Sequence, residues 1–207
     1  TDLHPDGFSA LLRYIYTGKL QVENVLEASY TRTAAIKYKL LDLSAKCSRY
    51  MAANVRPDDV CPLLDNFLTT GEQGADMAAR WLLRTQGLAV LNSSNFRACR
   101  ECTVKYALDH VVGVREASVI AAVYEWAQQQ CLSQNQDEGR VVSVRDVMRP
   151  LFSKLRFLAL TAKQFVQGPR MWGILDEKEA LALLRNIIEN DSVVMPSGFC
   201  KIRDQRS

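Results

Sequence analysis

The residues best able to do chemistry in this 207-residue chain are its six cysteines and two histidines. Cys99 and Cys102 form a CxxC pair, but a structural zinc site usually needs a second pair of ligands at matching spacing. Neither His4 nor His110 stands in an HxxxH or CxxH arrangement. We therefore predict no metal site and interpret the pair as ordinary thiols, one turn apart on a helix, of which one or both pack inward.

A cysteine nucleophile requires a base that holds its thiolate. His110 lies eight residues after Cys102 and eleven after Cys99, which on a common helix means a separation of about 12 Å or more. Pairing of His110 through the fold with Cys47 or Cys131 stays open. The sequence contains no GxSxG element, no phosphate-binding glycine loop and no HExxH motif. We predict a protein that is not an enzyme, with no catalytic residue and no cofactor.

Composition excludes other classes of function. The 26 basic and 23 acidic residues give a formal charge of +3, too balanced to indicate nucleic-acid binding. A basic set is interrupted by acidic residues and fits a solvated face; it comprises Arg97, Arg100, Lys105 and Arg115. No apolar run approaches a membrane span of roughly 18 residues. The scattered cysteines suit reduced thiols, so we expect a cytoplasmic location, with the nucleus as an alternative.

The elements that must position these residues are predicted to be helices almost throughout, because apolar residues recur at helical spacing and strict alternation is scarce. The fold class is therefore all-α. Predicted helices cover 5–16, 22–38, 40–51, 58–68, 77–88 and 116–131, and a last one opens at Asp176, whose spacing to Glu179 resembles a capping box. We predict a polar loop over 133–139, a kink or break at Pro150 and an irregular tail over 191–207.

The three tryptophans admit two interpretations, ligand stacking or core packing. Trp126 lies on the apolar stripe of its predicted helix together with Val119 and Val123, so core packing is favoured. Trp172 follows the break at 168–169 and stays open between the two.

Three separated segments carry a resemblance to a known family. LLRYIYTG at 11–18, followed by AAIKY at 34–38, resembles the helical C-terminal end of a BTB/POZ domain. Glu116, ten residues before Trp126 in VYEWAQQQC, resembles the middle of a BACK domain. KLRF at 154–157, then Phe165 and GIL at 173–175, resembles the later BACK helices. Their order is similar to that of BTB–BACK proteins, most of all the group with a C-terminal PHR domain.

This resemblance implies a domain organisation. Residues 1–53 would be the C-terminal part of a BTB/POZ domain, 54–190 a BACK bundle of antiparallel helical hairpins, and 191–207 a linker toward a further domain. It also implies that the BTB strands and the dimerisation helix precede Thr1, so that a homodimer would form through that part.

The function implied by the resemblance is a non-catalytic substrate adaptor of a cullin-RING E3 ubiquitin ligase, with a cullin scaffold and an unidentified protein substrate as partners. The resemblance implies that the cullin would contact the chain near Tyr16 and Lys19, and at the start of BACK near Asp58, Asp59 and Leu63. The competing interpretation packs Tyr16 on its own domain, and that interpretation is favoured for Tyr14. The alternative function is a BTB-type scaffold or transcription-related oligomer with no ligase role.

Overall fold

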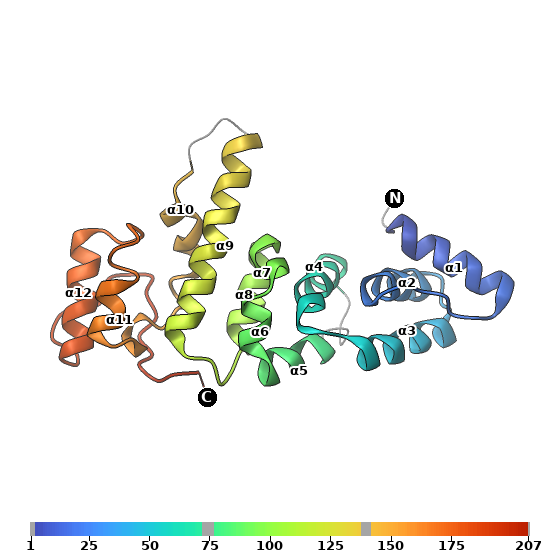
Figure 1. Cartoon of the computed structure of the whole chain (residues 1–207), viewed down its shortest axis with the longest axis horizontal. Coiled ribbons are helices and arrows are strands. Elements are labelled where there is room, and N and C mark those ends of the chain that lie inside the picture. The colour runs from blue at the N-terminus through green and yellow to red at the C-terminus, as the bar shows by residue number, and fades with distance from the viewer. Residues whose placement is uncertain (1–2, 72–76, 138–141, 207) are drawn as a thin grey trace.

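The computed structural model describes residues 3–71, 77–137 and 142–206, and all regular structure in these ranges is helical. This confirms the predicted all-α class. Figure 1 shows an elongated row of helices, with α1 to α3 at one end and α11 and α12 at the other. The helices are α1 (Pro5–Thr17), α2 (Val25–Lys37), α3 (Leu41–Asn54), α4 (Val60–Thr70), α5 (Met77–Thr85), α6 (Gly87–Leu91), α7 (Ser94–Ala98), α8 (Glu101–His110), α9 (Glu116–Asp137), α10 (Val144–Met148), α11 (Ala162–Gln167) and α12 (Glu177–Ile188), with short 3-10 turns η1 (Pro57–Asp59), η2 (Arg149–Leu151) and η3 (Phe157–Ala159).

The first three helices form a unit around α2, which packs on α1 and on α3. Their shared core is small and consists of Leu11, Ala34, Ala35, Leu43 and Cys47. Alanines on α2 let the neighbouring helix axes approach closely, as small residues do at helix contacts. The connection from α1 to α2 begins at Gly18, whose φ of 69° ends α1 in the left-handed conformation that glycine adopts without strain.

A second cluster joins this unit to α4. Val25 and Ala28 of α2, Met51 of α3, and Leu63 and Phe67 of α4 are all buried together. Because α4 thus packs on both helices of the preceding hairpin, the row continues without a flexible connection between α3 and α4. The turn η1 lies between them and is short, which limits how far the two can separate.

The large core is built around α9 and extends from α4 to α12. Trp126 is 2% exposed in its centre, and its indole N–H donates to the carbonyl of Cys99 at 2.8 Å. This confirms core packing for Trp126. Trp172 stacks on Tyr124, with ring centroids 4.4 Å apart, and is half-buried beside the same core.

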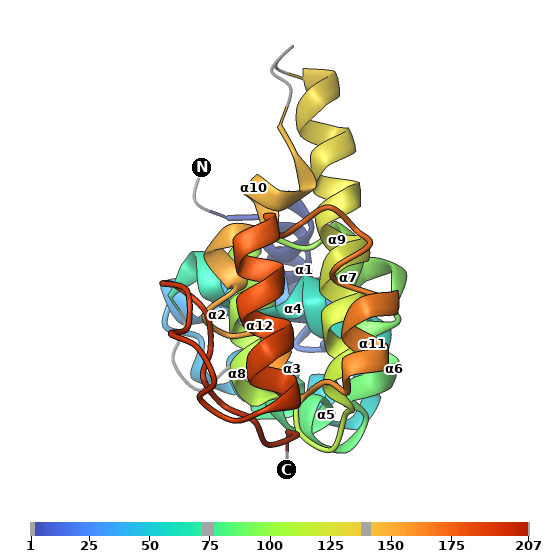
Figure 2. The same cartoon turned by 90° about the vertical axis from the view of Figure 1, so that its left-hand side faces the viewer.

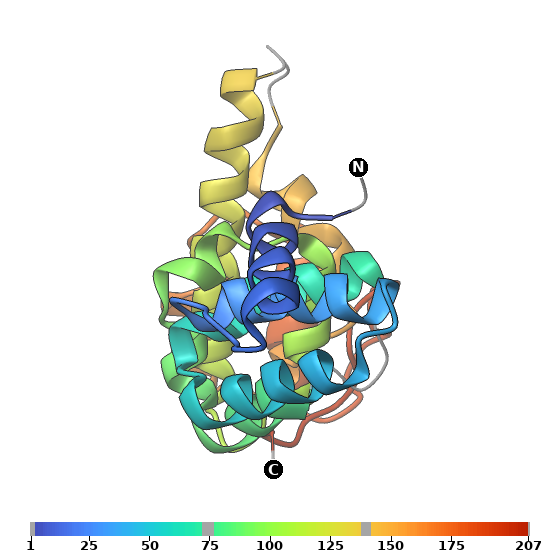
Figure 3. The same ribbon diagram turned by 90° about the vertical axis from the view of Figure 1, so that its right-hand side faces the viewer.

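The structure corrects the predicted extent of two helices. α9 continues to Asp137, beyond the expected end at 131, so residues 133–137 are helical and not a loop; 138–139 lie outside the described residues. This stretch is polar but contains no glycine or proline to stop a helix. Figures 2 and 3 both show the end of α9 rising above the rest of the molecule. The predicted helix over 77–88 is instead divided into two helices, α5 and α6. The second begins at Gly87, where a Cβ would lie 2.6 Å from a Val111 methyl carbon.

Other local predictions are confirmed. Pro150 ends α10 in the 3-10 turn η2, because proline lacks the N–H that an α-helix requires. Asp176 and Glu179 form the capping box at the start of α12, with Glu179 N–H donating to Asp176 at 2.8 Å. Among the described residues, no helix has both the length and the apolar character needed to span a bilayer.

Replacing Trp126 by alanine should lower the free energy of unfolding by about 3–5 kcal/mol, because removal of a buried large aromatic leaves a cavity and the carbonyl of Cys99 loses the nearer of its two donors. Trp81→Ala is the matched control, since Trp81 is 59% exposed. Urea unfolding followed by circular dichroism measures both. A Trp126→Ala variant as stable as the Trp81→Ala variant would contradict the central place of Trp126 in the core.

Candidate partner-binding groove

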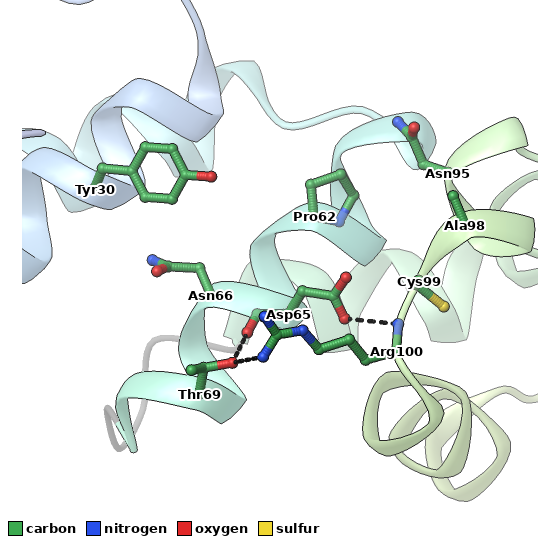
Figure 4. A pocket seen from close by; sticks show the side chains of 9 residues that line it. All are labelled: Tyr30, Pro62, Asp65, Asn66, Thr69, Asn95, Ala98, Cys99 and Arg100. Atoms are coloured by element: carbon green, nitrogen blue, oxygen red, sulfur yellow. Dashed lines mark hydrogen bonds between the residues drawn. The ribbon is translucent and has the colours of Figure 1, made fainter. Parts of the chain in front are cut away.

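Two adjoining hollows share the side chain of Tyr30 on α2. The first has a volume of about 350 Å³ and lies between α2, α4 and the connection from α7 to α8 (Figure 4). The second has a volume of about 340 Å³ and lies between α1 and the start of α2. We call the two together the junction groove; it is lined by Asp6, Ser9, Arg13, Glu23, Asn24, Leu26, Glu27, Tyr30, Pro62, Asp65, Asn66, Thr69, Asn95, Ala98, Cys99 and Arg100.

The wall between α1 and α2 depends on Gly7. A Cβ at this position would lie 2.5 Å from the carbonyl carbon and oxygen of Tyr30, so only glycine permits this approach. His4, which caps α1, stacks on the Tyr30 ring with centroids 3.9 Å apart. These two contacts fix Tyr30 at the shared edge of both hollows.

The opposite wall is held by a polar network between α4 and the start of α8. The Asp65 carboxylate accepts hydrogen bonds from the backbone N–H of Arg100 at 3.2 Å and from the hydroxyl of Thr103 at 2.5 Å. The Arg100 guanidinium donates to Thr69 Oγ1 at 2.8 Å (Figure 4). Asn66 donates across the groove floor to Ser29 of α2 at 2.7 Å. These hydrogen bonds hold α4 against α2 and against the start of α8.

The charge of the groove favours cationic partners. Its lining holds four carboxylates, on Asp6, Glu23, Glu27 and Asp65, against the two guanidiniums of Arg13 and Arg100. Arg13 is paired with Glu27 at 2.7 Å. Burial raises the pKa of the Tyr30 phenol above its ordinary value, and the negative charges of Asp6 and Asp65 raise this pKa further. The phenol thus remains a neutral donor in a negatively charged setting.

The predicted contact residues lie near the ends of this groove. Tyr16 is 86% exposed and follows Arg13 by three positions on α1, so it extends the same helix face. Lys19 is exposed just beyond α1. At the other end, Asp58 is exposed, and its carbonyl accepts a hydrogen bond at 2.7 Å from Asn95, which lines the groove. The Asp59 carboxylate accepts the N–H of Arg56 at 2.8 Å and closes the turn η1.

Leu63 lies outside the lining of this groove, and its burial gives no support to the cullin contact predicted for it. It is 1% exposed and packs in the cluster that joins α4 to α2 and α3. An apolar residue on a helix beside a groove can face either way, and Leu63 takes the inward side because closing the helix pair buries more apolar surface. Its side chain offers nothing to a partner in this structure.

Sequence reasoning missed Tyr30 as a groove residue and treated Arg100 only as part of a solvated face. Tyr30 meets the charge of Asp65 only in the fold, since 35 positions separate them. No motif or periodicity marks such a pair. The one signal in the sequence is an aromatic residue among small and polar ones on α2.

Tyr14 packs on its own unit, as favoured from the sequence. Its hydroxyl donates to Asp42 of α3 and accepts from Lys46 Nζ at 3.0 Å. Hydrogen bonds from Lys46 and then from Tyr14 lower the pKa of Asp42. Tyr14 thus ties α1 to α3 and leaves no hydroxyl proton for a partner.

The thiols of Cys99 and Cys47 are held in the protonated form. Cys99 is buried between α7 and α8, outside the common helix that we expected, whereas Cys102 is exposed on α8. One thiol of the pair therefore packs inward, as predicted. A hydrogen bond with Cys61, followed by burial, raises the pKa of Cys99, and burial raises that of Cys47 to about 12. Protonated thiols of this kind are poor nucleophiles. Among the described residues, no group of three or more His, Cys, Asp or Glu side chains is placed to hold a metal ion.

His110 forms no Cys–His pair in its observed contacts. Its ring stacks on Tyr106, and its Nδ1 lies 2.8 Å from the Tyr106 carbonyl oxygen. Cys47 lies in the core of the first three helices, and the Cys131 thiol donates to the Val142 carbonyl at 2.7 Å.

Comparison with known proteins agrees with the first part of the chain. The protein-family model of the BTB/POZ domain matches residues 1–55 of the sequence. This range ends at the residue after α3. The match supports the resemblance seen in the same segment of the sequence. The assignment of the following helices to a BACK domain stays a prediction.

Relatives with BTB/POZ names align with most of the chain. It is 24% identical over 185 residues to BTB/POZ domain-containing protein 6 of Xenopus tropicalis, covering 88% of this chain and 34% of that protein. It is 25% identical over 184 residues to the protein of the same name from Homo sapiens, with 86% and 33% covered. It is 24% identical over 182 residues to human BTB/POZ domain-containing protein 3, with 86% and 34% covered. The chain thus spans about a third of the length of these curated relatives.

Gly7→Ala should destabilise the first three helices by about 1–3 kcal/mol, because the added methyl group forces α1 away from the Tyr30 backbone. Ser9→Ala on the exposed side of the same helix is the control and should stay within about 0.5 kcal/mol of the parent. Urea unfolding measures both. Equal stability of the two variants would show that α1 does not pack this closely on α2.

The Tyr30 phenol should ionise above pH 10, its ordinary pKa. Because the folded state holds this proton more tightly than the unfolded state, the contribution of Tyr30 to stability is complete below pH 10 and is lost as the pH rises through the raised pKa. The near-ultraviolet absorbance titration of the parent minus that of Tyr30→Phe isolates this group. Asp6→Asn should lower the pH at which Tyr30 ionises, whereas Asp109→Asn should leave this pH unchanged. A Tyr30 transition at or below pH 10 in the parent would contradict the assignment.

Proposed function

We propose that this chain is a non-catalytic segment of a substrate adaptor for a cullin-RING E3 ubiquitin ligase. In this proposal residues 1–53 are the C-terminal part of a BTB/POZ domain, 54–190 form a BACK bundle, and the junction groove binds a segment of the cullin. The observation that carries the proposal is the position of the groove, which lies across the boundary of the BTB/POZ match.

The groove suits such a role because both parts of the chain build it. α1 and α2 come from the matched range, whereas α4 and the start of α8 follow it. The buried cluster between α2, α3 and α4 holds the two walls at a fixed separation. A partner that lies in the groove therefore contacts both parts at once and needs little rearrangement of either.

We propose an extended cullin segment with basic residues as the occupant. The excess of carboxylates in the lining complements lysine or arginine side chains. Tyr30 and Asn66 supply polar groups for a peptide backbone. Tyr16 and Lys19 would contact the partner at one end, and Asp58 and Asp59 at the other.

The mechanism would be proximity. An adaptor that binds a cullin through one surface and a substrate through another raises the effective concentration of the substrate at the site of ubiquitin transfer. No residue of this chain needs to be catalytic for that purpose, and no cofactor is required. The protein substrate is unidentified; it would be bound by a further domain, and a homodimer would form through other parts of the BTB/POZ domain. A cytoplasmic or nuclear location follows from this role.

An exposed apolar stripe on α1 supports assembly with further protein but does not choose between ligase and scaffold. Phe8 and Leu12 are each 39% exposed and Ile15 is 56% exposed, at spacings that place them on one helix face. A BTB-type scaffold or transcription-related oligomer without a ligase role would present the same stripe. Only cullin binding separates the two functions.

Titration calorimetry tests the proposal. The 207-residue chain and, in parallel, the full-length natural protein are each titrated with a cullin N-terminal fragment. We expect a dissociation constant of about 10 μM or tighter. Tyr16→Ala should weaken binding about tenfold or more while the melting temperature stays nearly unchanged, because the side chain is exposed. Met171→Ala, an exposed residue between α11 and α12, is the control.

Absence of binding by both proteins would reject the adaptor and favour the scaffold. If Tyr16→Ala lowers stability and leaves affinity unchanged, Tyr16 only packs on its own unit. Equal effects of Tyr16→Ala and Met171→Ala on affinity would remove Tyr16 from the binding surface.

A further inference from the structure

A buried ion pair fastens the last described residues to the helix bundle. Arg206 and Glu116 have side chains that are 4% and 0% exposed, and Arg206 Nε lies 2.7 Å from Glu116 Oε2. The second contact, from Arg206 Nη2 to Glu116 Oε1, is 3.3 Å. Ninety positions separate the two residues, so this pair joins the tail to the start of α9.

The remaining polar groups of the pair are also bonded. The Arg206 guanidinium donates to the carbonyl of Leu108, at the end of α8, and to that of Lys154 at 2.7 Å. Glu116 Oε1 accepts the backbone N–H of Arg156 at 2.8 Å. Three separate parts of the bundle thus converge on one guanidinium.

Further hydrogen bonds, each with at least one backbone partner, fix the adjoining residues. The side-chain amide of Gln205 accepts from the N–H of Glu116 at 2.7 Å and donates to the carbonyl of Ala159 at 2.6 Å. The Arg156 guanidinium donates to the carbonyls of Asp204 and Gln205 at 2.9 and 3.0 Å. The N–H of Gly113, in the turn between α8 and α9, donates to the carbonyl of Arg206 at 2.7 Å. Residues 204–206 are therefore held by bonds along their whole length.

A second attachment lies a few residues earlier. The ring of Phe199 is buried against Phe152 and Phe157, with centroids 5.0 and 5.7 Å away, and Arg149 lies over it at 5.3 Å. The N–H of Cys200 donates to the carbonyl of Phe152 at 3.2 Å. The tail is irregular, as predicted, but it is packed on the bundle and is not a free linker. Figure 1 shows it returning from α12 to the lower end of α9.

The chemistry of the Glu116–Arg206 pair differs from that of ordinary apolar packing. Burying two charges is costly, and apolar residues of similar size often stabilise a fold equally well. A buried arginine that binds one carboxylate and two carbonyls fits only one arrangement of these groups, whereas an apolar side chain tolerates several. A directional contact of this kind is suited to select one register of the tail on the bundle, whatever its net effect on stability.

We propose that Glu116 and Arg206 are positioning residues that fix where, and in which direction, the chain leaves the bundle. We call the pair the tail lock. Any domain that follows would then be held at a set place relative to the junction groove. Its use in placing a substrate rests on the proposed adaptor function. The tail lock itself does not, and it is tested on the chain alone.

Amide hydrogen exchange and backbone NMR relaxation of the full 207-residue chain test the tail lock. In Arg206→Met the Gly113 amide should exchange about tenfold faster or more than in the parent, while the core amide of Val123 changes less. Order parameters of residues 204–206 should fall, and those around Cys200 should stay high because Phe199 still anchors the chain. Arg206→Lys should restore part of the order, since lysine keeps the charge but not the fork of donors.

Glu116→Gln provides a milder variant that keeps an acceptor for the Arg156 amide. It should loosen residues 204–206 less than Arg206→Met does. Glu116→Gln combined with Arg206→Met should be more stable than Arg206→Met alone, because the single change leaves a buried carboxylate unpaired. Arg203→Met is the matched control in the same tail: Arg203 bonds the Asn186 carbonyl, so this change should leave the Gly113 and Arg156 amides unaffected.

Two results would overturn the proposal. If the Gly113 amide in Arg206→Met exchanges only together with Val123, Arg206 is part of the global core and does not form a separate attachment. If order parameters at 204–206 stay unchanged in both Arg206→Met and Glu116→Gln, the tail is held by other contacts. Neither result depends on cullin binding, so failure of the adaptor proposal leaves this test intact.

Discussion

The arrangement of the first half of the molecule depends on how closely three helices can pack around α2. Ala28, Ser29, Thr31, Ala34 and Ala35 are all fully buried, so α2 is covered on several sides by α1, α3 and α4. Helices surrounded in this way need small side chains, because larger ones would hold the axes apart. Gly7 extends the same requirement to α1. The junction groove is a consequence: where the helices diverge from this close contact, Tyr30 is left at the edge of the hollow.

Sequence periodicity was sufficient to predict the class of fold and most helices, because apolar stripes and capping residues are local signals. The start of α1 at Pro5, the capping box at Asp176 and the break at Pro150 are all of this kind. The errors fall where local signals are weak or ambiguous. The polar end of α9 carries no apolar stripe, and the division between α5 and α6 accompanies the close approach of Gly87 to Val111, which only the fold reveals.

The candidate site was less accessible to sequence reasoning. The exposure of Tyr16 agrees with its predicted availability, but Leu63 faces inward, since periodicity shows that a residue is apolar without showing which neighbour covers it. The groove itself draws on four helices and on the connection before α8. Its charge arises from carboxylates spread over 60 positions, from Asp6 to Asp65, and none of them forms a motif. Such a surface becomes visible only when the helices are placed in space.

A protein that acts by proximity must transmit geometry from one binding surface to another, and stiffness is then a functional property. The clusters at α2–α4 and around α9 overlap at Val55, so apolar packing is continuous from α2 to α12. A stiff row is of little use if the chain at its end is free, because each flexible residue widens the volume in which an attached domain moves. Phe199 and the Glu116–Arg206 pair remove that freedom at two points. On this view the proposed role of the pair accounts for the cost of burying two charges. Apolar packing stiffens the body of the row, whereas a directional contact also fixes the direction in which the chain leaves the bundle.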